Sequence, residues 1–484
     1  MYEFDPARLE KIAALRAEGI APWPAGPGPD LTSAEKIRAA AEGVADDALA
    51  ELGSFRFAGR LMFKNEMGKA GFARLLDRTG RFQVYVKKDD VGDDGLALFK
   101  KLDLGDIVGV EGGLMRTRTG ELTLKASGIR LLAKCVRSLP DKWHGVTDPE
   151  VRHRQRYLDL FINEEVRRTY ERRSKIVRYI RDYFEARDFL EVETPMMQPI
   201  PGGATARPFV THHNALDMQL YLRVAPELFL KRLVVGGLER VYEINRNFRN
   251  EGIDATHNPE FTMLEFYWAY ATWEHLVALT EELLSGLVRE VCGGSEIVYQ
   301  GQTISFAAPF RRAGFDELIA EHTGLPMADV HDAAKLGDFL GAKGSLGKLW
   351  EEAFDRHVEK KLVQPTFVTR FPVEISPLAR RNDAEPQIAD RFELFVAGRE
   401  IANGFNELND PVDQAERFAA QARAKDAGDA EAMHFDSDYV DALSYGMPPT
   451  AGEGIGIDRL VMLLTDQASI RDVILFPTLR RKQD

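Results

Sequence analysis

Cysteine is scarce in this chain: only Cys135 and Cys292 occur among 484 residues, and they stand in unrelated sequence contexts. Two isolated thiols can build neither a disulfide framework nor a cysteine zinc cluster. The chain is therefore not a small disulfide-stabilised domain, and its cysteine usage fits a reducing compartment.

Long apolar runs are missing as well. No stretch approaches the roughly 20 apolar residues that a membrane-spanning helix needs. The first ten residues, MYEFDPARLE, contain no basic region followed by an apolar one, so we expect no secretory signal. These absences predict a cytoplasmic protein with no membrane partner.

Basic residues are outnumbered: 63 Lys and Arg against 76 Asp and Glu give a formal net charge of −13. Indiscriminate binding to polyanions is disfavoured, because affinity for nucleic acid comes from clustered Lys and Arg. An RNA partner must meet a local basic patch. The arginines between residues 152 and 173 are one candidate, although a solvated helix face explains their pattern equally well.

What is present is the composition of an ordinary globular protein, with 29% charged and 44% hydrophobic residues. The hydrophobic pattern predicts a helical extension with a linker over residues 1–53, a barrel domain over 54–145 and a larger mixed domain over 146–484. The proline-containing segment LPDKW at 139–143 ends the barrel pattern and marks the boundary.

The extension is predicted to contain two helices. Asp5 is a suitable N-cap and Pro6 suits the first helical position, which predicts a helix over residues 5–18. The segment APWPAGPGPD at 21–30 is a linker. A second, polar helix is predicted over residues 32–52.

A two-residue period begins after Ser54 and predicts a half-buried strand. The residues placed on its inner face are Phe55, Phe57, Gly59, Leu61 and Phe63. Further strands are predicted over 72–76, 81–86, 106–115 and 121–132, with a helix over 95–102. Five strands with a helix between the third and fourth predict an OB-type barrel, a fold that commonly binds single-stranded nucleic acid.

The larger domain mixes helices and hairpins. Helices are predicted over 165–187, 273–291 and 346–363, a short strand over 189–194, hairpins over 240–270 and 391–407, and a glycine-rich strand running into a helix over 452–464. The predicted fold class is therefore α+β, with an antiparallel sheet flanked by helices beside the N-terminal barrel.

One candidate site lies in the first hairpin, FRNEGIDATHNPEFTMLEFYWAY. Arg249 ends one strand, and the period of two places Phe261, Glu265 and Tyr267 on one face of the next. An arginine beside a polar loop and an aromatic face could hold a phosphate and stack a purine. Taken alone, the aromatic residues are better explained as core.

The segment GEGIGIDRL also places an arginine beside a backbone that could bind a phosphate. Its glycines permit close backbone approach, and Arg459 falls in the first turn of a helix whose N-terminus attracts anions. Glycine-rich turns are common, so this segment alone is weak evidence for a phosphate-binding site. Two arginines on separate elements, each beside an anion-binding backbone, are a better argument for a triphosphate site.

The second hairpin, RFELFVAGREIANGFNELND, carries Glu393 and Glu400. If Ala397 and Gly398 are the turn residues, both carboxylates fall on one face and form an oxygen site suited to Mg²⁺. Residues further along have the opposite parity, namely Asn403, Phe405 and Glu407. A β-bulge near Ala402 or Gly404 would bring both sets to one pocket, and we predict one there. Taken alone, Glu407 is equally well a solvated carboxylate.

With these residues in place, a family resemblance is visible. FLEVETP at 189–195, the FRNEG to EF stretch and GIGIDR occur in the order of motifs one, two and three of class II aminoacyl-tRNA synthetases. LPDKWHG, RQRYLDL, ETPMMQPIPGGA, APELFLKRL, SPLARRND and GREIANGFNELND closely resemble the bacterial-type class II lysyl-tRNA synthetases. The resemblance runs from about residue 54 to the end of the chain.

The resemblance implies ATP-dependent activation of L-lysine to lysyl-adenylate, followed by transfer to the 3′-terminal ribose of tRNA(Lys). ATP is then a substrate, and up to about three Mg²⁺ ions per subunit assist it. Motif one builds the dimer interface in this class, so Pro195 and the preceding helix should meet a twofold partner in a homodimer.

The resemblance also implies site residues. Those implied for ATP are Arg249, Glu251, His257, Asn258, Phe261, Glu393, Glu400 and Arg459, with Arg249 and Arg459 catalytic and Glu393 and Glu400 the magnesium ligands. Those implied for lysine are Gly203, Glu227, Arg249, Glu265, Tyr267, Asn403, Phe405 and Glu407. A desolvated ammonium requires a carboxylate partner, so Glu407 would also reject uncharged amino acids.

In the barrel, Phe72 and Gln83 match positions that read the anticodon in the family, by stacking and by base-edge hydrogen bonds. The chain departs from the family pattern at Asn65 and Glu66, where arginine is common, and at Gly128, where glutamate is expected. These departures leave the anticodon base preference open.

Three rival functions remain at this stage. An aspartate or asparagine enzyme of the same subclass should present a cationic side-chain pocket where this chain has Glu407. A paralogue that modifies protein lysines generally lacks the N-terminal barrel. An inactive RNA-binding scaffold would be expected to have lost Arg249, Glu400 or Arg459, and all three are present.

Overall fold

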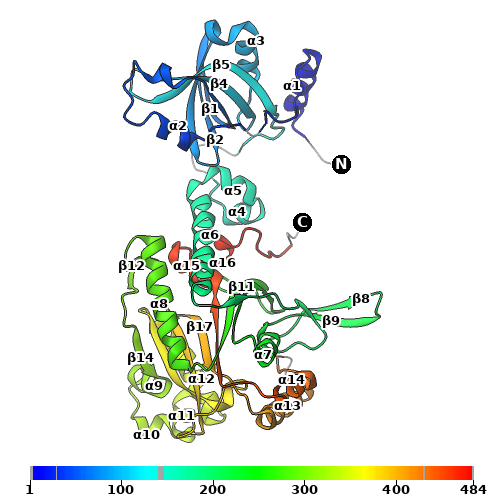
Figure 1. Cartoon of the computed structure of the whole chain (residues 1–484), viewed down its shortest axis with the longest axis vertical. Helices are drawn as coiled ribbons and strands as arrows, with labels where there is room; N and C mark the ends of the chain where they lie inside the picture. The colour runs from blue at the N-terminus through cyan, green and yellow to red at the C-terminus, as the bar shows by residue number, and fades with distance from the viewer. Residues whose placement is uncertain (1–3, 29, 140–145, 429–430, 482–484) are drawn as a thin grey trace. The chain divides into compact units, whose positions relative to one another are not determined.

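The computed structural model of the chain describes residues 4–28, 30–139, 146–428 and 431–481 (Figure 1). The chain divides into two compact units, residues 1–147 and 148–484. Most of the predicted boundary motif, residues 140–143, lies outside the described residues. Within the described ranges, no helix is both long and apolar enough to cross a membrane.

The first unit contains a closed barrel with strand order β1-β2-β3-β5-β4. Its elements are β1 (Phe55–Met67), β2 (Ala70–Asp77), β3 (Gly80–Lys87), α3 (Lys88–Lys101), β4 (Ile107–Arg116) and β5 (Leu122–Ala133). The β2–β3 turn closes because Asp77 Oδ1 accepts hydrogen bonds from the backbone N–H groups of Thr79 and Gly80 at 2.7 and 3.0 Å. The predicted OB-type barrel is confirmed.

One strand prediction fails at its end. The β1–β2 register shifts between Leu61 and Phe63, so Met62 is an extra residue in β1. A bulge of this kind reverses the alternation of side chains beyond it. Phe63 is consequently 42% exposed instead of sharing the inner face with Phe57 and Leu61.

The N-terminal extension is partly as predicted. Helix α1 (Pro6–Ala17) begins where expected, because the Asp5 side chain accepts a hydrogen bond from the N–H of Ala7. The second helix is much shorter than the predicted span: α2 covers Ala34–Ala40, and a separate 3₁₀ turn, η1, covers Leu49–Leu52. Gly43 lies between them with φ 72°, a left-handed conformation that a continuous helix does not contain.

The second unit is built on an eight-stranded sheet of order β14-β15-β16-β17-β18-β11-β10-β6. Its strands are β6 (Leu190–Glu191), β10 (Arg240–Phe248), β11 (Glu260–Ala269), β14 (Arg311–Gly314), β15 (Thr366–Pro372), β16 (Ile388–Val396), β17 (Arg399–Asn406) and β18 (Thr450–Gly456). Neighbouring strands from β15 to β10 are antiparallel, and only the two edge pairings are parallel. The predicted antiparallel sheet is confirmed, while the strand predicted over 189–194 shrinks to two residues.

Helices flank this sheet. They are α4 (Pro149–Arg154), α5 (Arg156–Ile162), α6 (Glu164–Glu185), α7 (Glu227–Val235), α8 (Trp273–Cys292), α9 (Phe315–Thr323), α10 (Met327–Val330), α11 (Ala333–Leu340), α12 (Leu346–His357), α13 (Pro411–Asp426), α14 (Ser437–Ser444), α15 (Ile457–Leu464) and α16 (Ile470–Val473). The unit also contains two 3₁₀ turns, η2 (Glu359–Lys361) and η3 (Val373–Ile375). A three-stranded sheet is formed by β7 (Met197–Gln198), β8 (Val210–His213) and β9 (Met218–Leu222), and a two-stranded sheet by β12 (Glu296–Tyr299) and β13 (Gln302–Ser305). The helix predicted over 346–363 therefore ends six residues early, at His357.

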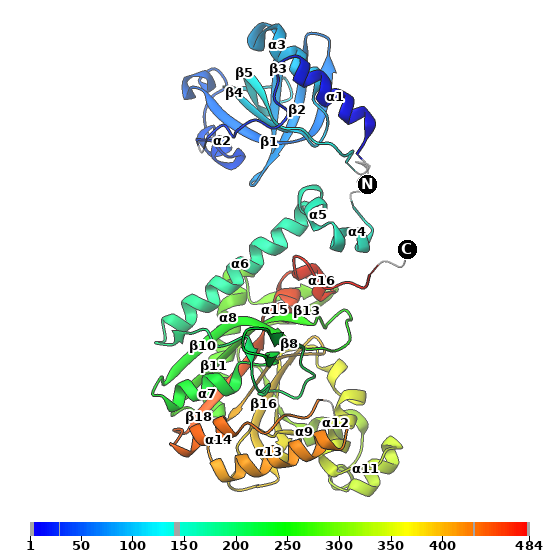
Figure 2. The same cartoon turned by 90° about the vertical axis from the view of Figure 1, so that its right-hand side faces the viewer.

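The two faces of the sheet have different coverings. Helix α8 packs against β16, β17 and β18 and lies in front of the sheet in Figure 1. Between them lies a large apolar core that includes Leu283, Leu287, Phe392 and Ile455. Helix α7 contacts β10 and β11, and Figure 2 shows it close to α13 and α14. Strand alternation therefore sends every second residue of β18 to the α8 core and the intervening glycines to the other face.

The arginines between residues 152 and 173 are largely used inside this unit. Arg152 and Arg156 both pair with Asp159, and Arg156 also donates to two backbone carbonyls near the end of the chain. Arg173 pairs with Asp458. Structural ion pairs account for these three arginines better than an RNA-binding patch does.

Glu453 of β18 is a buried carboxyl, and its hydrogen-bond partner among the described residues is Thr280 of α8, whose hydroxyl lies 2.7 Å from each of its oxygens. Burial raises the pKa of Glu453 to about 8, although the Thr280 hydrogen bond lowers it. The folded state therefore keeps a proton that the unfolded state loses above about pH 4.3. Stability should fall as the pH rises from there through about 8.

Glu453→Gln should remove this dependence, because an amide accepts the Thr280 hydrogen bond without titrating. We expect the difference between the melting temperatures of the variant and the wild type to change by at least about 2 °C in favour of the variant when the pH is raised from 6 to 9. Thermal unfolding followed by circular dichroism at several pH values measures the difference. Parallel curves for the two proteins would contradict the assignment.

Candidate active site

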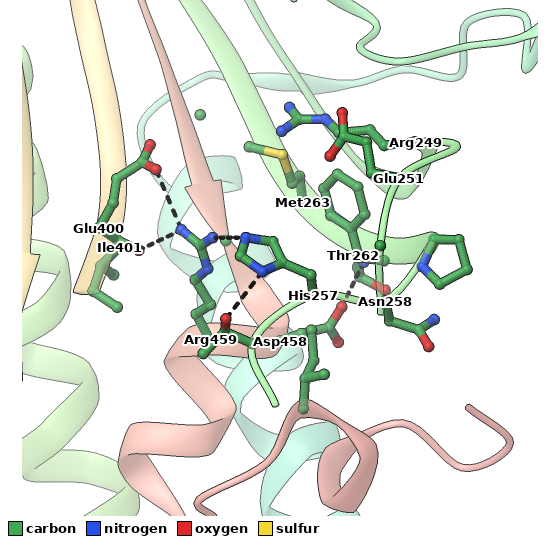
Figure 3. Close-up of a pocket in the computed structure, with 17 residues that line it drawn as sticks. Arg249, Glu251, His257, Asn258, Thr262, Met263, Glu400, Ile401, Asp458 and Arg459 are labelled. Atoms are coloured by element: carbon green, nitrogen blue, oxygen red, sulfur yellow. Dashed lines mark hydrogen bonds and ion pairs between the residues drawn. The ribbon is translucent and has the colours of Figure 1, made fainter. Parts of the chain in front are cut away.

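A cavity in the second unit is lined by β11, β17, β18, the start of α15 and the loop between β10 and β11 (Figure 3). Its lining residues are Arg249, Glu251, Gly252, Thr256, His257, Asn258, Pro259, Phe261, Thr262, Met263, Glu400, Ile401, Gly454, Gly456, Asp458, Arg459 and Ile470. Every residue predicted to bind ATP lines this cavity except Glu393. Segments more than 200 residues apart in sequence thus meet as the motif pattern predicts.

Arg249 follows the last residue of β10 and is held by a hydrogen bond from its N–H to the carbonyl of Pro259 at 2.9 Å. Its guanidinium lies 5.1 Å from the centroid of the Phe261 ring. Burial lowers the pKa of Arg249, while Glu400 and Glu251 oppose that shift. Its buried Nε meets no hydrogen-bond acceptor among the described residues. A buried cation with a spare donor is suited to an anionic ligand.

Arg459 lies across the cavity at the third position of α15. Its NH1 donates to the carbonyl of Glu400 at 2.9 Å and contacts Glu400 Oε2 at 3.2 Å, and its NH2 lies 3.4 Å from His257 Nε2. Figure 3 shows the guanidinium between Glu400 and His257. Burial alone would raise the pKa of Asp254, but hydrogen bonds from His257 and Thr256 lower it overall, so an ionised Asp254 orients the imidazole.

One side chain of the third motif, Asp458, contacts both the helix that precedes the first motif and the second motif. Its Oδ1 accepts from Arg173 of α6 at 2.5 Å, and its Oδ2 accepts from the N–H of Thr262 in β11 at 2.7 Å. Arg173 also donates to Thr262 Oγ1 at 3.1 Å. This network fixes the first turn of α15, and with it Arg459, against the hairpin that carries Arg249.

Asn258 and Phe261 differ in how much of their side chains is free. Asn258 donates to the carbonyl of Glu260 at 2.6 Å and accepts from the N–H of Thr478 at 3.1 Å. The side-chain amide of Asn258 is therefore engaged in hydrogen bonds that stabilise the β10–β11 loop. Phe261 presents a half-buried ring to the cavity, as an aromatic stacking surface requires.

Glu393 lies in an adjoining cavity that shares Thr256, His257, Glu400 and Arg459 with the first one. Burial raises the pKa of Glu393 to about 7; Arg391 opposes the shift, and Glu400 adds to it. Glu393 and Glu400 therefore repel each other when both are ionised, and a bound cation would relieve that repulsion.

The same two carboxylates are the part of the site suited to Mg²⁺, a cation that prefers oxygen ligands and usually takes only one or two carboxylates from a protein. Glu393 and Glu400 supply those oxygens beside the two-arginine cavity. Across the described parts of the chain, no cluster of three or more His, Cys, Asp or Glu side chains is arranged to hold a metal ion. Any remaining ligands would have to come from the phosphates of a nucleotide or from water.

The predicted β-bulge is confirmed. The β16–β17 register pairs Leu394 with Ala402 and Phe395 with Glu400, which leaves Ile401 as the extra residue. The turn falls at Ala397 and Gly398, with φ 54° and 65°, as predicted. Because of the bulge, Asn403 pairs with Glu393, so that the two sets of residues with opposite parity reach one face.

The residues predicted to bind lysine surround a second buried centre, next to α7. Lys231, with no exposed side-chain surface, donates to Glu227 Oε1 at 2.5 Å and forms an ion pair with Oε2 of Glu407. Its Nζ also lies 5.9 Å from the ring centroid of Tyr267 and 5.5 Å from that of Phe405. Glu407 is only 1% exposed, which excludes the alternative of a solvated carboxylate.

Glu265 adds a third carboxylate to this centre. It is buried and accepts a hydrogen bond from the Tyr267 hydroxyl at 2.7 Å. Burial raises the pKa of Glu265 to about 8, with repulsion from Glu227 adding to it. Burial likewise raises the pKa of Glu407 and of Glu227, while Lys231 opposes both shifts. The centre therefore holds more carboxylates than its own cation can balance.

Two glycines give this centre its shape. A Cβ on Gly452 would collide with Glu407 Oε1 and with the ring of Tyr267. Gly203 has φ +91°, and a Cβ there would lie 3.0 Å from the Cβ of Glu227. Both positions permit an approach that a larger residue would block.

Asn403 completes the predicted set. It accepts a hydrogen bond from Arg391 Nε at 3.1 Å, and Arg391 also forms an ion pair with Glu393. Arg391 therefore joins the lysine-side residues to the carboxylates predicted to bind metal. Sequence reasoning missed both Arg391 and Lys231: the two lie inside quoted motifs, but no local pattern indicates which carboxylates they meet.

In the barrel, Phe72 and Gln83 lie on one face of the β2–β3 hairpin. Phe72 pairs with Tyr85, and the two rings stand 4.9 Å apart. Gln83 donates to Thr123 Oγ1 at 2.9 Å and keeps part of its surface exposed. The two half-buried rings thus lie together on one face of the barrel, and the anticodon-binding role of Phe72 stays a prediction.

The departures from the family pattern lie on β1 and β5. Glu66 forms an ion pair with Lys64 at 2.8 Å, and Asn65 pairs with Phe72 in the β1–β2 register. Gly128 faces open space, where a Cβ would meet nothing within 4 Å. Asn65 and Gly128 therefore carry no charged group, and the carboxylate of Glu66 is paired with Lys64.

Comparison with known proteins agrees with this geometry. The profile of the family described as tRNA synthetases class II (D, K and N) matches residues 148–480, and that of the OB-fold nucleic acid binding domain matches residues 55–132.

Individual relatives are similar along most of their length. A protein of Thioalkalivibrio sulfidiphilus named lysine–tRNA ligase is 58% identical over 431 residues, which are 87% of this chain and 86% of that protein. Proteins of the same name from Edwardsiella ictaluri and Magnetococcus marinus are 54% and 53% identical, each covering 98% of this chain and, respectively, 95% and 97% of the relative.

Proposed function

Because the chain belongs to the class II tRNA synthetases of the D, K and N group, we propose that it is a lysine–tRNA ligase, which activates L-lysine with ATP and transfers it to tRNA(Lys). The observation that carries the choice of amino acid is the excess of buried carboxylates around Lys231.

The charges of that centre match lysine. The buried centre contains three carboxylates, those of Glu227, Glu265 and Glu407, and a single ammonium, that of Lys231. A bound lysine would add two more ammonium groups. Without a cation, burial favours the protonated carboxyls, while an ammonium ligand favours the ionised ones. Aspartate and asparagine bring no second cation, and aspartate adds another carboxylate, so the rival amino acids fit this centre poorly.

Within this proposal, Glu227 and the backbone of Gly203 receive the α-ammonium, and Glu407 with Tyr267 receives the ε-ammonium. Glu265 orients the Tyr267 hydroxyl. Asn403 and Phe405 form the neighbouring wall on the bulged strand. An uncharged side chain would leave Glu407 buried without its partner, which is costly.

The nucleotide occupies the cavity between the two arginines. Phe261 stacks on the adenine, Glu251, His257 and Asn258 line the nucleotide, Arg249 holds the α-phosphate and the lysine carboxylate, and Arg459 lies on the far side near the γ-phosphate. Glu393 and Glu400 would hold Mg²⁺, which would neutralise charge on the departing pyrophosphate. Up to about three such ions per subunit are proposed.

No protein nucleophile is needed. A lysine carboxylate oxygen attacks the α-phosphorus in line, the bond to the bridging oxygen breaks, and pyrophosphate leaves with that electron pair. Arg249 and Arg459 stabilise the charge that develops on the phosphoryl oxygens. The 3′-hydroxyl oxygen of the terminal ribose then attacks the lysyl carbonyl, its proton is lost, and AMP departs.

The barrel provides the anticodon contact. Phe72, together with Tyr85, offers stacking surfaces for unpaired bases, and Gln83 offers a base-edge hydrogen bond. The anticodon base preference depends on Asn65, Glu66 and Gly128, where the family's usual groups are replaced. The domains of the proposal are the extension at 1–53, the anticodon-binding barrel at 54–145 and the catalytic domain at 146–484.

A homodimer is also part of the proposal. Motif one, with Pro195 after the long helix α6, is the segment expected to meet a twofold partner. A cytoplasmic location follows from the proposed substrates, which are ATP, free lysine and tRNA.

Pyrophosphate exchange into ATP tests the activity without tRNA. Lysine, arginine, ornithine, aspartate and asparagine are supplied separately to the wild-type protein, and lysine alone is expected to support rapid exchange, because it alone places two ammonium groups at the right separation. Exchange with aspartate or asparagine would overturn the amino-acid assignment. No exchange with any of the five would favour an inactive scaffold.

A further inference from the structure

Glu407 has two oxygens in different surroundings. Neither oxygen accepts a hydrogen bond from a described residue although both are buried, but Oε2 forms an ion pair with the ammonium of Lys231 and Oε1 does not. Oε1 is the atom that a Cβ on Gly452 would strike, so it points to the side of the centre that the glycine leaves open. One oxygen is therefore occupied by the protein and the other is available to a ligand.

Lys231 is fixed from several sides. It is one helical turn after Glu227 on α7, and its Nζ lies near the faces of the Tyr267 and Phe405 rings. Its whole side chain is buried. A lysine held by two carboxylates and two rings has little freedom to move, so it can fix the position of Glu407.

We infer that Lys231 is a positioning residue for amino-acid selection: its ammonium bridges Glu227 and Glu407 and holds the second carboxylate with Oε1 turned toward the substrate ammonium. The inference rests on the proposed function, since it assigns the role of one more residue at the same site. Lys231 does not touch the reacting atoms and acts through Glu407.

The charge of Lys231 matters as much as its position. The titratable and charged groups around Glu407 are Glu227 and Lys231 of α7, Glu265 and Tyr267 of β11, and Tyr439 of α14, with Arg391 of β16 acting on Glu227. Lys231 is the cation nearest to Glu407 in this group. Without it, burial and the other carboxylates would raise the pKa of Glu407 further, and more free energy would be needed to ionise it for an incoming ammonium.

Lys231→Met tests this, because methionine keeps the length of the side chain and removes the charge. At pH 7 the KM for lysine in pyrophosphate exchange should rise at least about tenfold, or about 1.4 kcal/mol, while the KM for ATP changes less than about threefold. The preference for lysine over norleucine, an uncharged analogue that lacks the ε-ammonium, should fall by a similar factor.

The pH profile separates positioning from a merely structural role. The pH at which lysine KM reaches half of its total change should move by about one unit or more to higher pH in Lys231→Met, because Glu407 ionises later. Arg232→Met is the matched control: Arg232 is the next residue of α7 and pairs with Asp436 instead. Its lysine KM and pH profile should match those of the wild type.

If thermal unfolding shows that Lys231→Met does not fold, Lys231→Gln gives the same test, because its amide can donate to both carboxylates without a charge. An unchanged lysine KM, or an increase independent of pH and shared with ATP, would overturn the inference. The wild type is assayed in parallel, and the absence of lysine-dependent exchange in it would refute the proposed function. If the wild type is active and the Lys231 variants keep its KM for lysine, only the role of Lys231 is refuted.

Discussion

Arg249→Met is expected to lower the rate of lysine-dependent pyrophosphate exchange by about a thousandfold. The guanidinium is buried and keeps a donor without a described acceptor, so a phosphate can take it without first displacing another partner. In the proposed reaction, charge grows on the α-phosphoryl oxygens beside it. An interaction that strengthens in the transition state affects kcat more than KM.

Steady-state exchange at saturating lysine and ATP measures this effect. Arg246→Met is the matched control, since Arg246 lies three residues earlier, on β10, and forms a half-exposed ion pair with Glu260 at 3.3 Å. Its rate should stay within about threefold of the wild type. A loss of similar size in both variants would show that general disruption of the hairpin explains the result, and a small loss in Arg249→Met would remove the arginine from the chemistry.

Glu407→Gln should raise the KM for lysine by about a hundredfold, because a buried charge pair loses one partner. The neutral amide cannot balance the substrate ammonium, and Lys231 would then lack its second carboxylate. The preference for lysine over norleucine should fall together with the affinity. The KM for ATP should stay nearly constant, because Glu407 does not line the nucleotide cavity.

Glu453→Gln controls for the replacement of any buried carboxyl in this sheet. Glu453 follows Gly452 on β18 but bonds to Thr280 of α8, on the opposite face. Its lysine KM should equal that of the wild type. A wild-type KM for lysine in Glu407→Gln, or an equal loss of lysine affinity in both variants, would refute the role of Glu407 in selecting lysine.

The fold was largely predictable because its long elements have clear periods. The barrel strands, the two hairpins and the glycine-rich strand before α15 are all found near their predicted bounds. The errors lie where local geometry overrides the period. Met62 reverses the exposure of Phe63, and Gly43 interrupts the helix predicted over 32–52. The sequence pattern carries no strong signal for either.

The family resemblance is confirmed by the matching profiles and relatives. Residue types and parity also predicted which side chains would meet, including the bulge between Glu400 and Asn403. Lys231 was beyond such reasoning, because it lies on α7 while Glu407 lies 176 positions later, after β17. The distinct surroundings of the two Glu407 oxygens also depend on tertiary packing.

The β-bulge at Ile401 decides which face of β17 its later residues take. Glu400 stands before the extra residue and Asn403 and Phe405 stand after it, yet all three face the site. Straightening the bulge without changing the number of residues would turn Asn403 and Phe405 toward the core under α8, whereas deleting Ile401 would leave Glu400 and Asn403 two positions apart and on one face of a regular strand. The relative phase of the nucleotide-side and amino-acid-side groups is therefore set by the bulge that accommodates this one extra residue.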